Sequence, residues 1–342
     1  DSMAAGVSGL SRDLDALFEV LTDVVRRPRF DADEAERARA EQLAGLEKAK
    51  DSPHVLAMRS FQAVLYPGHR YGLPIEGSPE GVAELGPGDA AELHARVFNA
   101  SNAIFFATGD LEAADLLRRV ETGFGDWPAG SVPEPGPPPP TPAPAERRIV
   151  LVDRPDLGQA QIVVGHDGIS RTDPERLPAS LMNTVLGSGG FSSRLMTRVR
   201  ANEGLTYGIS SYFALRRHPG PFAVHTFTRV TEVRRVVDLV LSELARVRSD
   251  PPSPEEVANA QSQTVGQFSL GLETSSAVAS SLVDLDVHGL PEDSLDTFRG
   301  RIRALAAEDT TRAARELVHP ERAAILVVGP AEAIVPQVED LG

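Results

Sequence analysis

Residues 186–207 read LGSGGFSSRLMTRVRANEGLTY, and this stretch decides how the second half of the chain folds. A loop with three glycines precedes a short helix. Ser192 or Ser193 can cap that helix, because a serine hydroxyl accepts a hydrogen bond from a free backbone N–H of the first turn. The helix is predicted to run to about Asn202, with Gly204 as its left-handed stop.

A strand is predicted to follow that helix. Its period of two places on one face Leu205, Tyr207, Ile209 and Ser211. Arg200, in the last helical turn, and Tyr207 therefore flank one tight turn, and we expect both to point at a common ligand. Taken singly, an arginine at a helix end also fits a solvated charge, and a strand tyrosine also fits a core residue.

The composition is that of a globular protein. The chain has 342 residues, of which 41% are hydrophobic and 24% charged, so two domains are expected. The net charge of −15 argues against nucleic acid or an anionic membrane as a partner. The sequence contains no cysteine, which excludes disulfides and thiolate chemistry. The compartment stays undetermined, with the cytoplasm favoured over the periplasm.

Hydrophobic periodicity predicts the secondary structure. Helices are expected at residues 11–27, 32–50, 54–65, 80–85, 89–97, 111–124, 174–186, 230–247, 254–272, 275–288, 295–305 and 310–317. Strands are expected at residues 103–108, 148–152, 159–165, 207–213, 220–227 and 323–328.

A proline-rich segment divides the chain. Nine prolines lie between Pro128 and Pro144, a density that neither a helix nor an inner strand tolerates. We therefore predict a partial first domain over residues 1–127, a linker over residues 128–146 and a second domain over residues 147–342.

The two halves resemble each other. Residues 98–109 (FNASNAIFFATG) match residues 318–329 (VHPERAAILVVG) at an offset of 220, and residues 33–38 match residues 255–260 at an offset of 222. This pattern predicts an internal duplication. The first copy is then expected to begin roughly 75 residues before residue 1, so its opening strands and helix would be missing. The predicted fold class is α+β, with two homologous domains that each have a mainly antiparallel sheet covered by helices.

Several segments, in this order, resemble the M16 zinc metallopeptidases (pitrilysin and processing peptidases) of the small M16B type, which have LuxS/metallopeptidase-like domains. They are PGHRYG at 67–72, GFGDWP at 123–128 and residues 186–207. The resemblance implies that cleaving members carry His-x-x-Glu-His on a first-domain helix, with a glutamate as third zinc ligand about 75 residues later.

This sequence departs from that zinc pattern. It contains no His-x-x-Glu-His, and the resemblance places Gly45 at the third-ligand position. We therefore expect no metal ligand in this chain. The eight histidines show no ligand spacing and are expected to be ordinary surface or core residues.

The resemblance also implies a division of labour between two kinds of subunit. One kind holds zinc, and the other carries an Arg-x6-Tyr pair, which Arg200 and Tyr207 match. Arg200 would orient the substrate, and Tyr207 would support the oxyanion that forms when water attacks a peptide carbonyl. The expected peptide-binding residues are Gly187, Ser188, Gly189, Gly190, Phe191 and Ser192.

The sequence thus predicts the non-zinc subunit of a heteromeric M16B endopeptidase. Its expected partners are a zinc-motif M16 subunit, which would hold the zinc, and peptides or unfolded proteins as substrates. Two alternatives stay open. One is a non-catalytic scaffold of the same fold, against which the intact Arg200 and Tyr207 argue. The other is a homodimeric zinc peptidase whose zinc motif lies before residue 1, against which Gly45 argues.

Overall fold

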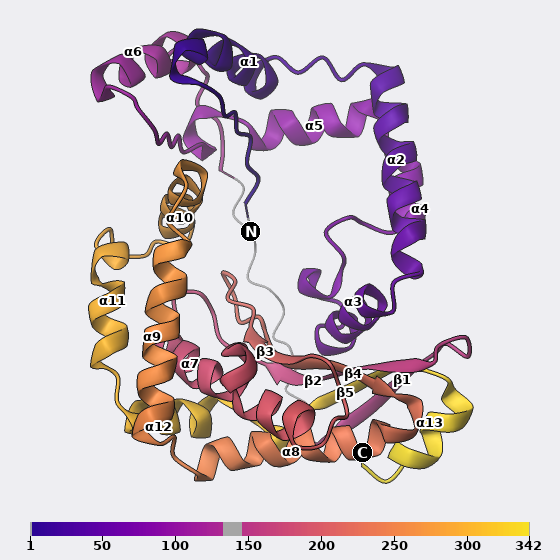
Figure 1. Cartoon of the computed structure of the whole chain (residues 1–342). Coiled ribbons are helices and arrows are strands. Elements are labelled where there is room, and N and C mark those ends of the chain that lie inside the picture. The colour runs from indigo at the N-terminus through magenta and orange to yellow at the C-terminus, as the bar shows by residue number, and fades with distance from the viewer. Residues whose placement is uncertain (1, 133–145, 342) are drawn as a thin grey trace. The chain divides into compact units, whose positions relative to one another are not determined.

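The computed structural model describes residues 2–132 and 146–341 (Figure 1). These residues form two compact units, and each unit draws on separate parts of the chain. Unit 1 combines residues 2–47, 76–132 and 269–290. Unit 2 combines residues 48–75, 146–268 and 291–341. In the part of the chain that is described, no helix is long and apolar enough to cross a membrane.

Unit 1 is helical throughout its described residues. Its helices are α1 (Leu14–Arg26), most of α2 (Ala32–Lys50), α4 (Pro79–Glu84), α5 (Pro87–Val97), α6 (Ala113–Phe124) and α10 (Ser275–Val287). Helices α1 and α6 are joined by Arg26, whose Nη1 donates to the carbonyl oxygen of Gly123 at 2.6 Å. The ring of Phe18 in α1 lies 5.6 Å from that of Phe105, between ring centroids.

The strand predicted at residues 103–108 is wrong for this chain. These residues belong to no strand in the structure, and 57% of Ile104 is exposed. A strand exists only where a neighbour shares its backbone hydrogen bonds, and among the described residues none does so here. The sheet expected in the first domain is therefore not found in residues 2–132.

Unit 2 contains a five-stranded mixed sheet. Its strands are β1 (Arg148–Asp153), β2 (Gln159–Asp167), β3 (Ile209–Phe213), β4 (Pro221–Arg229) and β5 (Ala324–Gly329). The strand order is β1-β5-β2-β4-β3, in which β1 and β5 run parallel and every other pair is antiparallel. The fold class is α+β, as predicted, with one sheet covered by helices.

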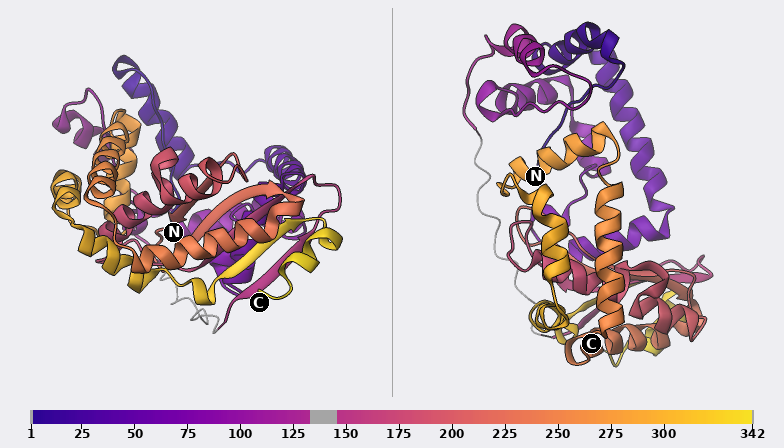
Figure 2. Two further views of the ribbon diagram at one scale, coloured as in Figure 1. Left: turned by 60° about the horizontal axis from the view of Figure 1, so that its bottom comes forward. Right: turned by 60° about the vertical axis from the view of Figure 1, so that its left-hand side comes forward.

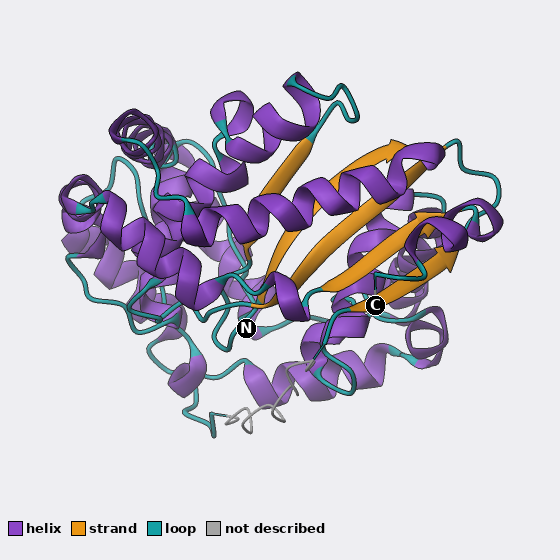
Figure 3. Ribbon diagram, turned by 90° about the horizontal axis from the view of Figure 1, so that it is seen from below, coloured by secondary structure: helices purple, strands orange, loops and turns teal. Residues whose placement is uncertain are grey.

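Alternate residues of the strands face two different helical layers. On one face, side chains such as Ile162, Phe222 and Ile325 pack against α8 (Val233–Ser249), α12 (Ala307–Leu317) and α13 (Ala331–Val338). On the other face, Val163 and Leu326 pack against α3 (Pro53–Leu65). Figures 2 and 3 show α8 lying along the sheet, with α3 on the opposite face. Residues 0% exposed line both faces, so this sheet is the core of unit 2.

A third cluster packs beside the sheet. It joins α7 (Arg176–Asn183), α9 (Pro254–Leu270) and α11 (Ser294–Ala304) through Leu177, Leu181, Val185, Ala260 and Ile302. Helix α7 ends earlier than the predicted residue 186, because the chain continues as a π-helical turn over Thr184–Ser188. Such turns are common at functional sites.

The compact units cut across the domains predicted from chain order. Helix α3 belongs to unit 2 although it precedes the proline-rich segment, and α10 belongs to unit 1 although it follows that segment. The predicted linker over residues 128–146 lies mostly outside the described residues, at 133–145. The domain boundaries at residues 127 and 147 therefore stay predictions.

Elements of the two halves nevertheless recur at the offsets seen in the sequence. Helix α9 begins 222 residues after α2, and α10 both begins and ends 222 residues after α3. Helix α12 repeats the bounds of α5 at an offset of 220. The internal duplication stays a prediction, to which these offsets add support.

Candidate functional site

The glycine-rich stretch of unit 2 folds into a loop followed by a short helix. The loop passes through a 3-10 turn at Gly190–Ser192, and the helix that follows is π-helical over Met196–Ala201. Ser193 is the cap, since its Oγ accepts from the backbone N–H of Met196 at 3.4 Å. Gly204 has φ +65°, as expected of a left-handed helix stop.

Two glycines of the loop are required by close packing. A Cβ atom at Gly187 would collide with Ser211 Oγ of β3, and one at Gly189 would collide with the carbonyl oxygen of Thr184. The Nδ2 of Asn183 donates to the carbonyl oxygen of Ser211 at 3.0 Å, and Ser211 Oγ donates to Asn183 Oδ1 at 2.6 Å. The loop is thus fixed against the sheet, and its role in peptide contact stays a prediction.

Arg200 lies on an exposed aromatic ring. Its guanidinium carbon is 4.6 Å from the centroid of the Phe191 ring, a cation–π contact, and Phe191 is 75% exposed. Phe191 follows Gly190, whose φ of +61° is a left-handed conformation that glycine adopts without strain. The stacked ring limits the directions that the Arg200 fork can take, while the group stays on the surface of the unit.

Tyr207 departs from the predicted strand face. Strand β3 begins only at Ile209, and Tyr207 is 79% exposed, whereas Leu205 and Ile209 are buried. The cause is a turn at Thr206, whose Oγ1 donates to the carbonyl oxygen of Gly208 at 2.9 Å and accepts from its N–H at 3.1 Å. This turn directs the Tyr207 side chain outward. Its hydroxyl makes no hydrogen bond within residues 2–132 and 146–341.

The turn at Thr206 is itself held by the sheet. Thr226 of β4 is 0% exposed, and its Oγ1 lies 3.2 Å from Thr206 Oγ1 and 2.9 Å from the carbonyl oxygen of Gly208. Neither threonine was identified by the sequence analysis. Their signal was only a polar residue on a strand that is otherwise apolar, which is also common at a sheet edge.

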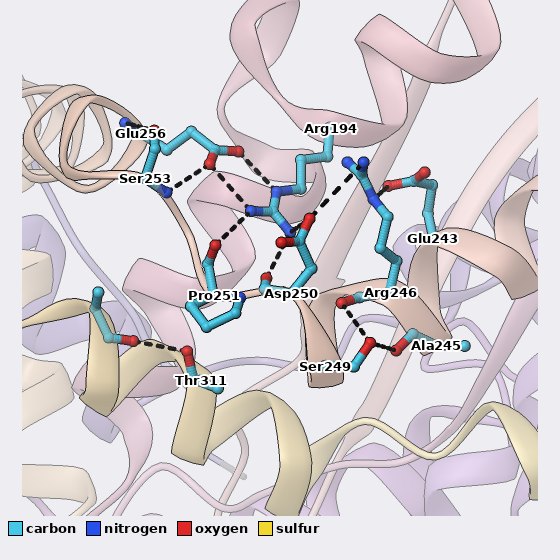
Figure 4. Close-up of polar contacts among 11 residues, drawn as sticks. Arg194, Glu243, Ala245, Arg246, Ser249, Asp250, Pro251, Ser253, Glu256 and Thr311 are labelled. Carbon is cyan, nitrogen blue, oxygen red and sulfur yellow. Dashed lines mark hydrogen bonds and ion pairs between the residues drawn. The ribbon is translucent and has the colours of Figure 1, made fainter.

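Arg194 anchors the short helix and was likewise not identified (Figure 4). Its side chain is only 5% exposed, and it donates from Nε to Glu256 Oε1 at 2.7 Å and from Nη2 to Glu256 Oε2 at 3.0 Å. Its Nη1 donates to the carbonyl oxygen of Asp250 at 3.0 Å. Charge-assisted paired bonds of this kind fix both distance and orientation.

Glu256 in turn caps α9. It accepts from the backbone N–H of Ser253 at 2.8 Å, while Ser253 Oγ accepts from the backbone N–H of Glu256 at 3.1 Å. The hydrogen bond from Arg194 holds the pKa of Glu256 below its ordinary value. The start of the Arg200 helix is therefore tied to the start of α9 by an ionised pair. No local pattern could reveal this, since 62 residues separate the partners.

No hollow of unit 2 gathers the predicted site residues. The described residues show two surface hollows, of about 430 and 540 Å³, and neither is lined by Arg200 or Tyr207. Within the same residues, no cluster of three or more histidine, aspartate or glutamate side chains could hold a metal ion. Gly45 lies exposed on α2 with open space where a side chain would start.

Comparison with known proteins identifies the family. The peptidase M16 inactive domain matches residues 85–264, just over half of the chain. The chain therefore belongs to the M16 peptidase family, and its matched part is of the inactive-domain type. Among curated proteins, an uncharacterised zinc protease of Streptomyces coelicolor is 25% identical over 94% of this chain and 70% of that protein. One of Mycobacterium tuberculosis is 28% identical over 94% of this chain and 73% of that protein.

Solved structures agree with this assignment. A peptidase M16 inactive domain from Pseudomonas fluorescens is 26% identical, with a TM-score of 0.86 over 94% of this chain and 76% of that chain. A chain of complex III2 from Candida albicans shares the fold at 18% identity and a TM-score of 0.78, over 96% of this chain and 76% of that chain.

Proposed function

We propose that this chain is the non-zinc subunit of a heteromeric M16 endopeptidase, in which Arg200 and Tyr207 act on a peptide bound at a partner's zinc. The observation that carries the proposal is the presentation of these two residues. Tyr207 is turned out of the sheet by Thr206, and Arg200 is stacked on Phe191 at 4.6 Å, so both offer donors at the surface of a fixed scaffold.

The chemistry of the two side chains suits peptide hydrolysis. Attack of water on a peptide carbonyl places negative charge on its oxygen, and a positioned hydroxyl such as that of Tyr207 stabilises this charge as it develops. The guanidinium of Arg200 binds a carbonyl or carboxylate through paired donors. The partner's zinc would activate the attacking water. Gly45 supports this division, because glycine has no side chain with which to bind zinc.

The kinship of the two halves forms part of the same proposal. We infer that the chain is an internal duplication, supported by the recurrence of α2, α3 and α5 as α9, α10 and α12 at offsets of 222, 222 and 220. The name zinc protease, carried by relatives such as that of Streptomyces coelicolor, supports membership of a hydrolytic complex.

The test is reconstitution. The chain in its full-length form, and a zinc-motif M16 protein that co-purifies with it, are assayed for cleavage of an unstructured peptide, separately and mixed. The proposal predicts that each is inactive alone and that the mixture cleaves. Cleavage by this protein alone would favour the homodimeric zinc peptidase instead. A mixture that forms a stable complex without cleaving would favour the scaffold.

A further inference from the structure

Two histidines from separate elements of unit 2 meet at one edge of α3. His54 lies in the first turn of α3 and His225 lies in the middle of β4. The Nδ1 of His54 is 3.0 Å from the Nε2 of His225, and the two rings meet edge to face at 76°. A third polar atom, Gln161 Oε1 of β2, lies 3.2 Å from the same His225 Nε2.

The sheet register explains why these side chains converge. His225 is paired with Val163, and Gln161, two residues before Val163, points to the same face. Helix α3 covers this face through Ala57 and Phe61, which are 0% exposed. His54 precedes Ala57 by three positions and Phe61 by seven, and it therefore lies on the same side of the helix. The backbone that carries the three atoms is thus fixed by the core of unit 2.

We propose that His54 Nδ1, His225 Nε2 and Gln161 Oε1 form a binding site for one divalent transition-metal ion, with Zn²⁺ as its natural occupant. In a tetrahedral site with Zn–N bonds of about 2.0–2.1 Å, ligand atoms lie about 3.3 Å apart. The distances of 3.0 and 3.2 Å between the atoms here come within a few tenths of an ångström of that spacing. Solvent supplies the fourth ligand, because His54 is exposed.

The protonation of the pair also suits a cation. Only one proton can lie between His54 Nδ1 and His225 Nε2, and a metal ion bound to both lone pairs replaces it. Burial, and secondarily the charge of His54, lower the pKa of His225 to about 4. Its imidazole is therefore neutral at pH 7, the form that binds metal ions.

The donor set selects the kind of ion. Two imidazole nitrogens suit borderline ions such as Zn²⁺, Cu²⁺ and Ni²⁺, whereas Mg²⁺ and Ca²⁺ require oxygen ligands, mostly carboxylates. A bound ion would join α3 to β2 and β4 at the end of α3 that the apolar core does not cover. The proposal concerns residues other than Arg200 and Tyr207, and it stands or falls independently of the proposed function.

The experiment is a titration of the metal-free full-length protein with Zn²⁺, followed by calorimetry. The matched variants are His54→Ala and His319→Ala. Both replace a histidine at the surface, and His319 lies beside Glu321, 3.3 Å from Nδ1 to Oε1. We expect one Zn²⁺ per chain, an affinity at least about tenfold lower in His54→Ala, and no change in His319→Ala. Absence of binding to the parent protein, or equal affinity in His54→Ala, would overturn the proposal.

A spectroscopic readout separates this site from unspecific binding. With one equivalent of Cu²⁺, electron paramagnetic resonance should show hyperfine splitting from two imidazole nitrogens in the parent protein and in His319→Ala. His54→Ala should retain the splitting of a single nitrogen. An identical two-nitrogen spectrum in His54→Ala would place the ion elsewhere and contradict the assignment.

Discussion

Residues 103–109 and 323–329 carry nearly the same pattern, AIFFATG and AAILVVG, yet only the second forms a strand. Strand β5 lies between β1 and β2 and is 0% exposed at Ile325, whereas Ile104 is 57% exposed and no described residue pairs with its segment. The comparison teaches that an apolar run specifies burial, and that the neighbouring strands decide whether burial takes the form of a sheet.

Helices α2 and α9 show the same contrast between two related elements. At the start of α9, Glu256 is held by the buried Arg194. At the matching position of α2, 222 residues earlier, Glu34 meets only Arg37 on its own helix, with both side chains more than half exposed. One acidic first turn is therefore part of a three-dimensional network, and the other is a solvated helix end.

The sharpest way to test the first comparison is a pair of identical truncations. Ile325→Ala should lower the free energy of unfolding by about 2–5 kcal/mol, because it opens a cavity between the sheet and the helices that cover it. Ile104→Ala should cost less than about 1 kcal/mol, because most of that side chain is already in water. Urea unfolding of both variants measures the difference. Equal costs would mean that residues 103–109 are packed as firmly as β5.

The second comparison is tested by removing one arginine from each helix start. Arg194→Ala should cost about 3 kcal/mol, at the lower end of the range for a broken buried ion pair because a third of the Glu256 side chain is exposed. Arg37→Ala should leave unfolding unchanged, as expected of an exposed pair. If thermal melting moved equally in both variants, the Arg194 network would have no special weight.

Acid provides a smaller test of the sheet in unit 2. Burial lowers the pKa of His166, which is 0% exposed, to about 4. The unfolded chain therefore binds a proton below about pH 6.5 that the folded chain refuses until about pH 4. The free energy of unfolding should fall with acidification through this window, by about 2 kcal/mol between pH 7 and pH 5.

The control for this pH effect is His166→Gln. The Nε2 of His166 accepts from the backbone N–H of His319 at 2.9 Å, and the glutamine carbonyl offers a neutral acceptor in its place. Urea unfolding at pH 7 and pH 5 should then show a smaller loss of stability than in the parent protein. An unchanged loss in the variant would assign the pH dependence to other groups.

Much of the fold was predictable from local pattern. Helix α2 has the predicted bounds, Ala32–Lys50, because acidic residues open it and Ser52-Pro53 follow its end. Strand β4 was predicted within two residues at each end. Gly204 was identified as a helix stop because only its left-handed φ allows the chain to reverse there.

What could not be predicted depends on partners distant in sequence. The prediction that Tyr207 shares the face of Leu205 and Ile209 was wrong, because Thr206 makes a turn that the buried Thr226 stabilises. The pair of Arg194 and Glu256, the placement of α3 on the sheet of unit 2, and the meeting of His54 with His225 all join residues that no local periodicity connects.

The measurement that tests the central claim most directly is kcat of the reconstituted peptidase with Tyr207→Phe, compared with Tyr212→Phe. Both variants remove one phenolic oxygen, but Tyr212 lies within β3, and its hydroxyl is buried without a hydrogen-bond partner in the part of the chain that the structure describes. The account predicts a fall of about 10²–10³ in kcat for Tyr207→Phe and none for Tyr212→Phe. Equal kcat values for the two variants would contradict a catalytic role for the Arg200–Tyr207 pair.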